Sequence, residues 1–72
     1  METIKIARGT AELMFSKDEL MILSNSLNEV CNGIDLHEFS TRLGADVADV
    51  RKLLKELGAV FDNPILNQPR LP

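Results

Sequence analysis

Residues 3–20 read Thr-Ile-Lys-Ile-Ala-Arg-Gly-Thr-Ala-Glu-Leu-Met-Phe-Ser-Lys-Asp-Glu-Leu, and the spacing of apolar residues changes within this stretch. Residues 3–7 and 10–15 alternate between apolar and other side chains, with the period of two that is typical of β-strands. Gly9 lies between these two runs and can adopt the positive φ that a tight turn needs. The stretch therefore predicts an N-terminal two-stranded β-hairpin over residues 3–15.

The alternation predicts a hairpin with apolar side chains gathered on one side of each strand. Ile4 and Ile6 share a side of the first strand, and Ala11, Leu13 and Phe15 share a side of the second. A hairpin of two strands is at best marginally stable in water by itself. We therefore expect this hairpin either to lie on the rest of the chain or to pair with a second copy.

A helix is predicted to follow the hairpin directly. Ser16 is suited to be its N-cap, and Glu19 lies three residues later, which is the spacing of a capping box. Gly33 is placed to end this helix as a C-terminal cap. Between these ends the apolar residues recur with helical spacing at Leu20, Leu23, Leu27 and Val30.

Two shorter helices are predicted after the first. Asp35 is placed to cap the second helix and Gly44 to end it, with Leu36, Phe39 and Leu43 on its inner face. The third helix is predicted to begin at Asp46 and to end at Gly58.

Three prolines in the remaining residues 59–72 exclude a long helix, so this part is predicted to form an extended tail. The fold class is thus α+β, with a hairpin over residues 3–15, three helices over residues 17–58 and the tail. The chain has 72 residues, so these elements are expected to form one domain.

Cys31 is the only cysteine, so no disulfide can form within the chain. This absence is typical of a reducing compartment and predicts a cytoplasmic protein. No apolar run approaches the length of a membrane span or of a signal peptide. We therefore expect neither a membrane partner nor secretion.

The formal net charge of −3 arises in one region of the chain. Acidic and basic residues balance elsewhere, and the excess comes from Glu19, Glu29 and Asp35, in and just after the first predicted helix. Proteins that bind nucleic acid usually carry a basic excess, because neutralisation of phosphates supplies much of their affinity. The charge therefore disfavours nucleic acid as the partner.

Residues 36–58 read Leu-His-Glu-Phe-Ser-Thr-Arg-Leu-Gly-Ala-Asp-Val-Ala-Asp-Val-Arg-Lys-Leu-Leu-Lys-Glu-Leu-Gly. This third of the chain resembles the helix-turn-helix of bacterial regulators and of winged-helix domains, which implies a trihelical unit. The resemblance also implies DNA binding, with Arg51, Lys52 and Lys55 on phosphates. Asp46 and Asp49 depart from the family pattern, because they lie where the reading helix approaches bases. Capped helices joined by a glycine turn also pack in this way in proteins that never touch DNA.

A second resemblance covers residues 23–44, which look like part of small uncharacterised bacterial proteins. It implies a bacterial origin and carries no established activity.

No arrangement of residues predicts catalysis. Cys31, Asp35 and His37 lie near one another in sequence, but one cysteine, one histidine and one carboxylate do not match a ligand set of known spacing. The glycines are spaced as turn and cap residues and not as a phosphate-binding loop. A domain of this size with few aromatic residues also offers little pocket volume. We therefore expect no enzyme, no metal, no cofactor and no small-molecule substrate.

Six residues are candidates for an interaction surface. Asn25 and Asn28 make one side of the first helix polar and weakly charged, which fits either a partner interface or a solvated face. Met14, Met21, Ile65 and Leu66 form either an adaptable contact patch or gap-filling parts of a small core. The leading hypothesis is a non-enzymatic protein-interaction module, as an adaptor, inhibitor or immunity-type protein that also self-associates. The alternative is a DNA-binding regulator.

Overall fold

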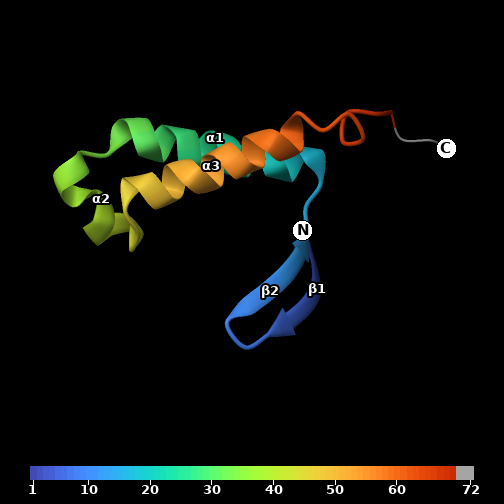
Figure 1. The fold of residues 1–72 in the computed structure, drawn as a ribbon, viewed down its shortest axis with the longest axis horizontal. Helices are drawn as coiled ribbons and strands as arrows, with labels where there is room; N and C mark the ends of the chain where they lie inside the picture. Colours follow the sequence, from blue (N-terminus) through green and yellow to red (C-terminus); the bar gives the residue numbers. More distant parts are fainter. Residues whose placement is uncertain (70–72) are drawn as a thin grey trace.

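The computed structural model describes residues 1–69, which form a two-stranded antiparallel hairpin followed by three helices (Figure 1). This is the α+β fold that the sequence predicts. The elements are strand β1 (Glu2–Ala7), strand β2 (Thr10–Met14), helix α1 (Lys17–Gly33), helix α2 (Leu36–Leu43) and helix α3 (Val47–Phe61).

A two-residue turn, Arg8-Gly9, joins the two strands. Gly9 has a φ of +82°, whereas Arg8 does not have a positive φ. A type I′ turn needs positive φ at both central residues, so this turn is of another type. Gly9 therefore supplies the left-handed conformation that the sequence predicts at this position.

Helix α1 begins with the predicted capping box. The Ser16 hydroxyl accepts a hydrogen bond from the Glu19 N–H at 3.1 Å, and the Glu19 carboxylate accepts one from the Ser16 N–H at 2.9 Å. The predicted role of Gly33 as a C-terminal cap was wrong, because Gly33 is the last helical residue and its φ is not positive. Ile34 caps the helix in an extended conformation that turns its side chain towards the core.

Helix α2 has both predicted ends. The Asp35 carboxylate accepts a hydrogen bond from the His37 N–H at 2.9 Å, and Gly44 adopts a φ of +72° while its N–H donates to the Ser40 carbonyl. Asp46 begins helix α3, but its side chain makes no capping hydrogen bond there. The Asp46 carboxylate instead accepts a hydrogen bond from the Ser40 hydroxyl at 2.7 Å. This bond joins the start of α3 to α2.

Helix α3 continues three residues beyond Gly58, so the predicted end of this helix was wrong. A glycine inside a helix costs about 1 kcal/mol relative to alanine. Gly58 and Phe61 are half-buried, and burial of this turn offsets that cost. The helix ends just before Asn63 and Pro64, because the residue that precedes a proline disfavours the helical conformation.

Residues 64–67 form a turn, so the predicted extended conformation was wrong for this part of the tail. The Asn67 amide donates to the carbonyls of Phe61 and Asn63 at 2.7 and 3.2 Å, which holds the turn against the end of α3. Residues 70–72, the last part of the predicted tail, lie outside the described residues.

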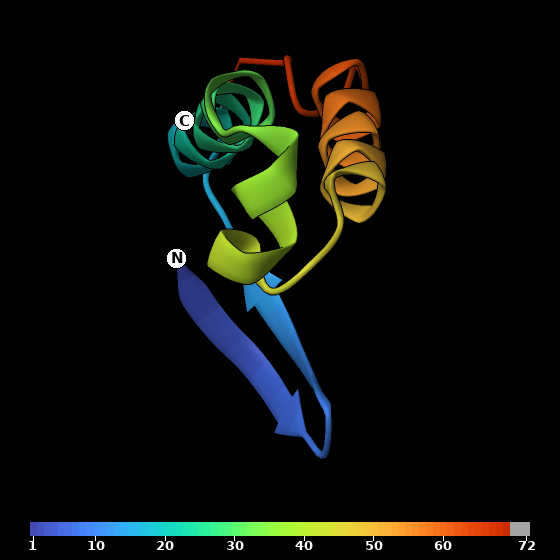
Figure 2. The same ribbon diagram turned by 90° about the vertical axis from the view of Figure 1, so that its left-hand side faces the viewer.

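Helices α1 and α3 lie side by side and run in opposite directions, while α2 crosses one end of the pair (Figures 1 and 2). The core lies where the three helices meet. Phe39 of α2 is 1% exposed and packs with Cys31 of α1 and Val50 of α3. Leu36 was predicted to face inwards with Phe39, but it is 66% exposed because it lines an open groove beside the core. The half-buried residues that complete the cluster are Leu27, Val30, Ile34, Ala45 and Val47.

The hairpin projects away from the helices and packs on none of them within residues 1–69 (Figure 1). The chain is consequently elongated, with a radius of gyration of 14.5 Å, whereas a compact chain of this length has one of about 11 Å. Its accessible surface is 6132 Å², whereas a compact monomer of this mass exposes about 4,450 Å². The hairpin was predicted either to lie on the rest of the chain or to pair with a second copy, and it does not lie on the helices.

Candidate interaction surface

One face of the hairpin is apolar and uncovered. Ile6 lies opposite Ala11, and Thr3 lies opposite Leu13, so these residues share one face of the two strands. Ile4 is the extra residue of a β-bulge between Thr3 and Lys5, and the bulge interrupts the alternation of side chains along β1. We call Ile6, Ala11 and Leu13 the hairpin apolar face.

The large residues of the hairpin apolar face are exposed to solvent. Ile6 is 77% exposed and Leu13 is 40% exposed, and Ile4 in the neighbouring bulge is 59% exposed. Contiguous apolar surface of this kind is uncommon on monomers and usually marks a contact with another molecule. The sequence predicts that Ala11 and Leu13 share a side of β2, but it does not reveal that the helices leave that side uncovered. The bulge breaks the alternation from which Ile4 and Ile6 were predicted to share a side of β1.

The opposite face of the hairpin is mostly polar. Lys5 lies directly opposite Glu12, which places opposite charges across the two strands. Glu2 lies opposite Met14, which is 52% exposed. Met14, one of the predicted contact residues, therefore belongs to the polar face of the hairpin and not to its apolar face.

A groove of about 280 Å³ lies where the hairpin meets helix α1, and it was not foreseen from the sequence. The N-terminal ammonium of Met1 binds the Glu19 carboxylate there, so this contact holds the start of β1 against α1. The ammonium and then the Ser16 N–H stabilise the ionised form and lower the pKa of Glu19 to about 2. The groove is lined by Met1, Phe15, Glu19, Ile22 and Leu23.

The other predicted contact residues lie on the helical unit. Met21 is 49% exposed on α1, where Asn25 and Asn28 are also exposed. Ile65 is 75% exposed in the turn beyond α3, whereas Leu66 beside it is half-buried. Met14 is on the hairpin, which does not contact these helices. A single contact patch made of all these residues stays a prediction.

The three basic residues of the predicted DNA-binding helix are exposed on α3. Arg51, Lys52 and Lys55 form no ion pair with any carboxylate within residues 1–69. Asp46 and Asp49 lie in or before the first turn of the same helix. The acidic N-terminus and the basic middle of α3 therefore present opposite charges along one helix.

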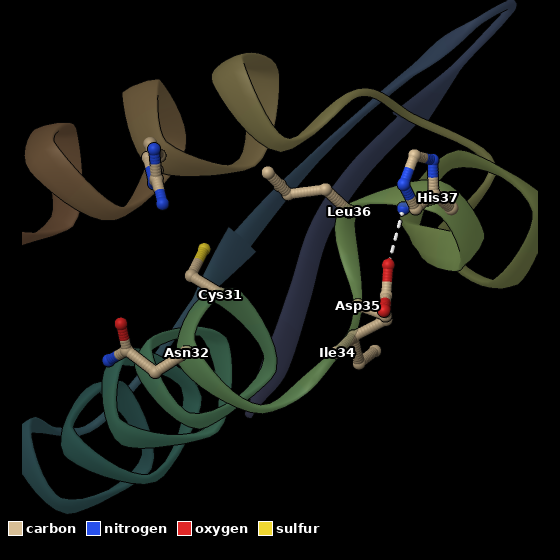
Figure 3. A pocket seen from close by; sticks show the side chains of 7 residues that line it. Cys31, Asn32, Ile34, Asp35, Leu36 and His37 are labelled. Atoms are coloured by element: carbon tan, nitrogen blue, oxygen red, sulfur yellow. Dashed lines mark hydrogen bonds between the residues drawn. The ribbon is translucent and has the colours of Figure 1, made fainter.

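A second groove, of about 550 Å³, lies between α1, α2 and α3 (Figure 3). Cys31 is buried in the core and lies apart from Asp35 and His37, while the Asp35 carboxylate caps α2. Among residues 1–69, no three His, Cys, Asp or Glu side chains come together in a way that could hold a metal ion. The lining residues are Cys31, Asn32, Ile34, Asp35, Leu36, His37 and Arg51.

Comparison of the chain with models of protein families, with curated proteins and with solved structures found no match. Across the described part of the chain, every helix is too short or too polar to cross a lipid bilayer. The candidate surface is therefore assigned from its geometry and chemistry alone.

Proposed function

We propose that this chain is a small, non-enzymatic bacterial protein-interaction module that binds a protein partner through the hairpin apolar face. An adaptor, an inhibitor and an immunity-type protein would all use such a surface. The observation that carries the proposal is the exposure of Ile6 and Leu13 on one face, with the helices packed elsewhere.

Two further features support this proposal. Each isoleucine that becomes buried against a partner contributes about 1.5–3 kcal/mol, so a few such residues can anchor a complex. The helical unit has its own core around Phe39 and can present the hairpin without drawing on it for stability. The groove at the hairpin base offers further apolar surface at Phe15 and Ile22.

The proposal is tested by photocrosslinking in the cell that makes this protein. A benzophenone amino acid replaces Ile6, on the hairpin apolar face, in one variant. In the matched control it replaces Lys5, the neighbouring residue on the polar face. We expect a covalent adduct with a different protein from position 6 and little from position 5. Equal labelling from both positions, or no adduct with a different protein, would contradict the proposal.

DNA binding is a second candidate, and it is favoured by three exposed cations on α3 that form no ion pair within residues 1–69. Arg51, Lys52 and Lys55 would contact phosphates, while Asp46 and Asp49 would repel them. Titration of mixed duplex DNA at low salt tests this candidate, since phosphate contacts weaken steeply as salt rises. Binding that disappears in the triple variant Arg51→Ala, Lys52→Ala, Lys55→Ala would support it. Absence of binding by the unmodified chain would exclude it.

A further inference from the structure

We propose that Asn32-Gly33 is a site of spontaneous deamidation, which turns Asn32 into an aspartyl or isoaspartyl residue and loosens the end of helix α1. Such a change is independent of the proposed function, because it limits how long the helical unit keeps its native covalent structure. Asn32 is the only asparagine of the chain that a glycine follows. Glycine has no Cβ, so its backbone nitrogen can approach the preceding side chain more freely than that of any other residue.

The reaction needs no partner other than water. The backbone nitrogen of Gly33 attacks the Cγ atom of the Asn32 side chain, and a succinimide ring closes. The side-chain amide nitrogen leaves as ammonia and takes with it the proton of the Gly33 N–H. One water molecule then opens the ring at either of its two carbonyls, which yields an aspartyl or an isoaspartyl link. No oxidant or reductant is consumed.

The last turn of α1 leaves this dipeptide open to solvent. Asn32 and Gly33 are both exposed, and a Cβ added at Gly33 would meet no atom within 4 Å. The Asn32 amide donates to the Asn28 Oδ1 atom at 3.4 Å, which is long for a hydrogen bond and holds the side chain weakly. Asn32 also lines the open groove of about 550 Å³, where its amide points away from Asp35 and His37 (Figure 3). Packing within residues 1–69 therefore does not keep the side chain from the Gly33 nitrogen.

The helical conformation at this position slows the reaction without preventing it. In an α-helix the N–H of Gly33 is bonded to the carbonyl of Glu29, so the last turn must open before the nitrogen can attack. Helix ends fray, and they open at a lower free energy than helix interiors. The last turn of α1 contains no basic residue to stabilise its carbonyl end, and the capping bond from the Ile34 N–H to the Val30 carbonyl is 3.3 Å long. We therefore expect the rate of deamidation to follow the opening of this turn.

The other asparagines of the chain are better protected. Asn25 and Asn28 lie in the interior of α1, where local opening costs more than at its end. Asn63 precedes Pro64, whose nitrogen carries no proton to give up. The Asn67 amide donates to two backbone carbonyls at 2.7 and 3.2 Å, which fixes its side chain. The expected order of reaction therefore begins at Asn32.

Deamidation adds a negative charge at an unfavourable end of α1. The C-terminus of a helix carries a partial negative charge, and Glu29 lies three residues before Asn32 on the same side of the helix. An isoaspartyl link also lengthens the backbone between Cys31, in the core, and Ile34, which packs against it. Arg51 lines the same groove and offsets part of the new charge, but not the longer backbone. We therefore expect the deamidated chain to be less stable than the original one.

Mass spectrometry of the purified chain during incubation at mildly alkaline pH tests the proposal, with fragmentation to locate each lost amide. The unmodified chain is compared with Gly33→Ala and with Gly58→Ala, a matched control that removes a helix glycine with no asparagine before it. We expect Asn32 to lose its amide first. Gly33→Ala should slow this loss by about fivefold or more, the factor that helix propensity alone supplies. Gly58→Ala should leave the rate unchanged, because the opening is local to α1.

The chain unfolded in guanidinium chloride gives the rate without the helix. If Asn32 in the native chain reacts no faster than Asn28 over the time in which the unfolded chain reacts, the helix closes the site and the proposal is overturned. An equal rate in Gly33→Ala would also overturn it. Asn32→Asp introduces the charge without the reaction and should shift the urea midpoint of helix unfolding to a lower concentration. An unchanged midpoint would overturn the effect of the charge on stability.

Discussion

The helical unit and the hairpin use their apolar residues in different ways. In the helical unit, Cys31, Phe39 and Val50 meet in a core, and hydrogen bonds at the helix ends fix the chain around it. In the hairpin, Ile6 and Leu13 share one face with Ala11, yet both remain exposed. A regular apolar pattern therefore predicts that a face is suited to burial. It does not predict whether the contact that buries this face lies within the chain or with another molecule.

The largest effect that separates the two regions is expected from Phe39→Ala. Removing a buried phenylalanine costs about 3–5 kcal/mol, which is comparable to the whole stability of a domain this small. We expect the helices to unfold at room temperature, as measured by far-UV circular dichroism during urea titration. Leu36→Ala is the matched control on the same helix, because Leu36 is 66% exposed. Equal destabilisation by both variants would show that the core is not centred on Phe39.

Two glycine substitutions are expected to change stability in opposite directions. Gly44 has a φ of +72°, so Gly44→Ala should destabilise the helices by about 1–2 kcal/mol. Gly58 lies within α3, and an added Cβ would meet no atom within 4 Å. Gly58→Ala should therefore stabilise by up to about 1 kcal/mol. Thermal unfolding measures both, and destabilisation by Gly58→Ala would contradict a helix that continues to Phe61.

The same contrast explains which parts of the fold could be predicted from sequence. Ser16, Asp35 and Gly44 act through neighbours within a few residues, so their roles were readable as local patterns. The helix ends predicted at Gly33 and Gly58 could not be read from local patterns. Tertiary packing of half-buried Ile34 and Phe61 decides the backbone conformation there.

Part of the candidate surface could likewise be predicted from local sequence patterns, and part of it could not. The grouping of Ala11 with Leu13 on one side of β2 follows from the period of two and was predicted. The groove at the hairpin base was missed, because it joins Met1 to Ile22 of α1. Nothing local in the sequence relates those two residues. The position of the hairpin relative to the helices is also a tertiary property, so its exposure could not be read from the alternation.

The junction between the two regions is expected to respond weakly to pH. The folded-state pKa of Glu19 is about 2, below its ordinary value of 4.5, so ionised Glu19 stabilises the fold. This contribution is fully present above about pH 4.5 and is lost as the pH falls towards 2. Solvent screening makes the effect smaller than those above. Urea unfolding at several pH values should show a shallower acid loss in Glu19→Gln, and identical pH profiles would contradict the contact with Met1.

The smallest effect on helix stability is expected from Ile6→Lys. Ile6 contacts no helix, so the free energy of helix unfolding should change by less than about 0.5 kcal/mol. The same substitution should abolish photocrosslinking to a protein partner from a probe at Leu13 on the same face. Urea titration in dilute solution measures the first effect. A loss of helix stability as large as that of Phe39→Ala would mean that the hairpin apolar face is covered by the chain itself.

The most direct test of the central claim, that a protein partner covers the hairpin apolar face, is photocrosslinking in the cell from position 6, with the probe at position 5 as the matched control. We expect a covalent adduct with a different protein from position 6 and little from position 5, because Ile6 lies on the hairpin apolar face and Lys5 lies on the polar face. Equal labelling from both positions, or no adduct with a different protein, would contradict the account.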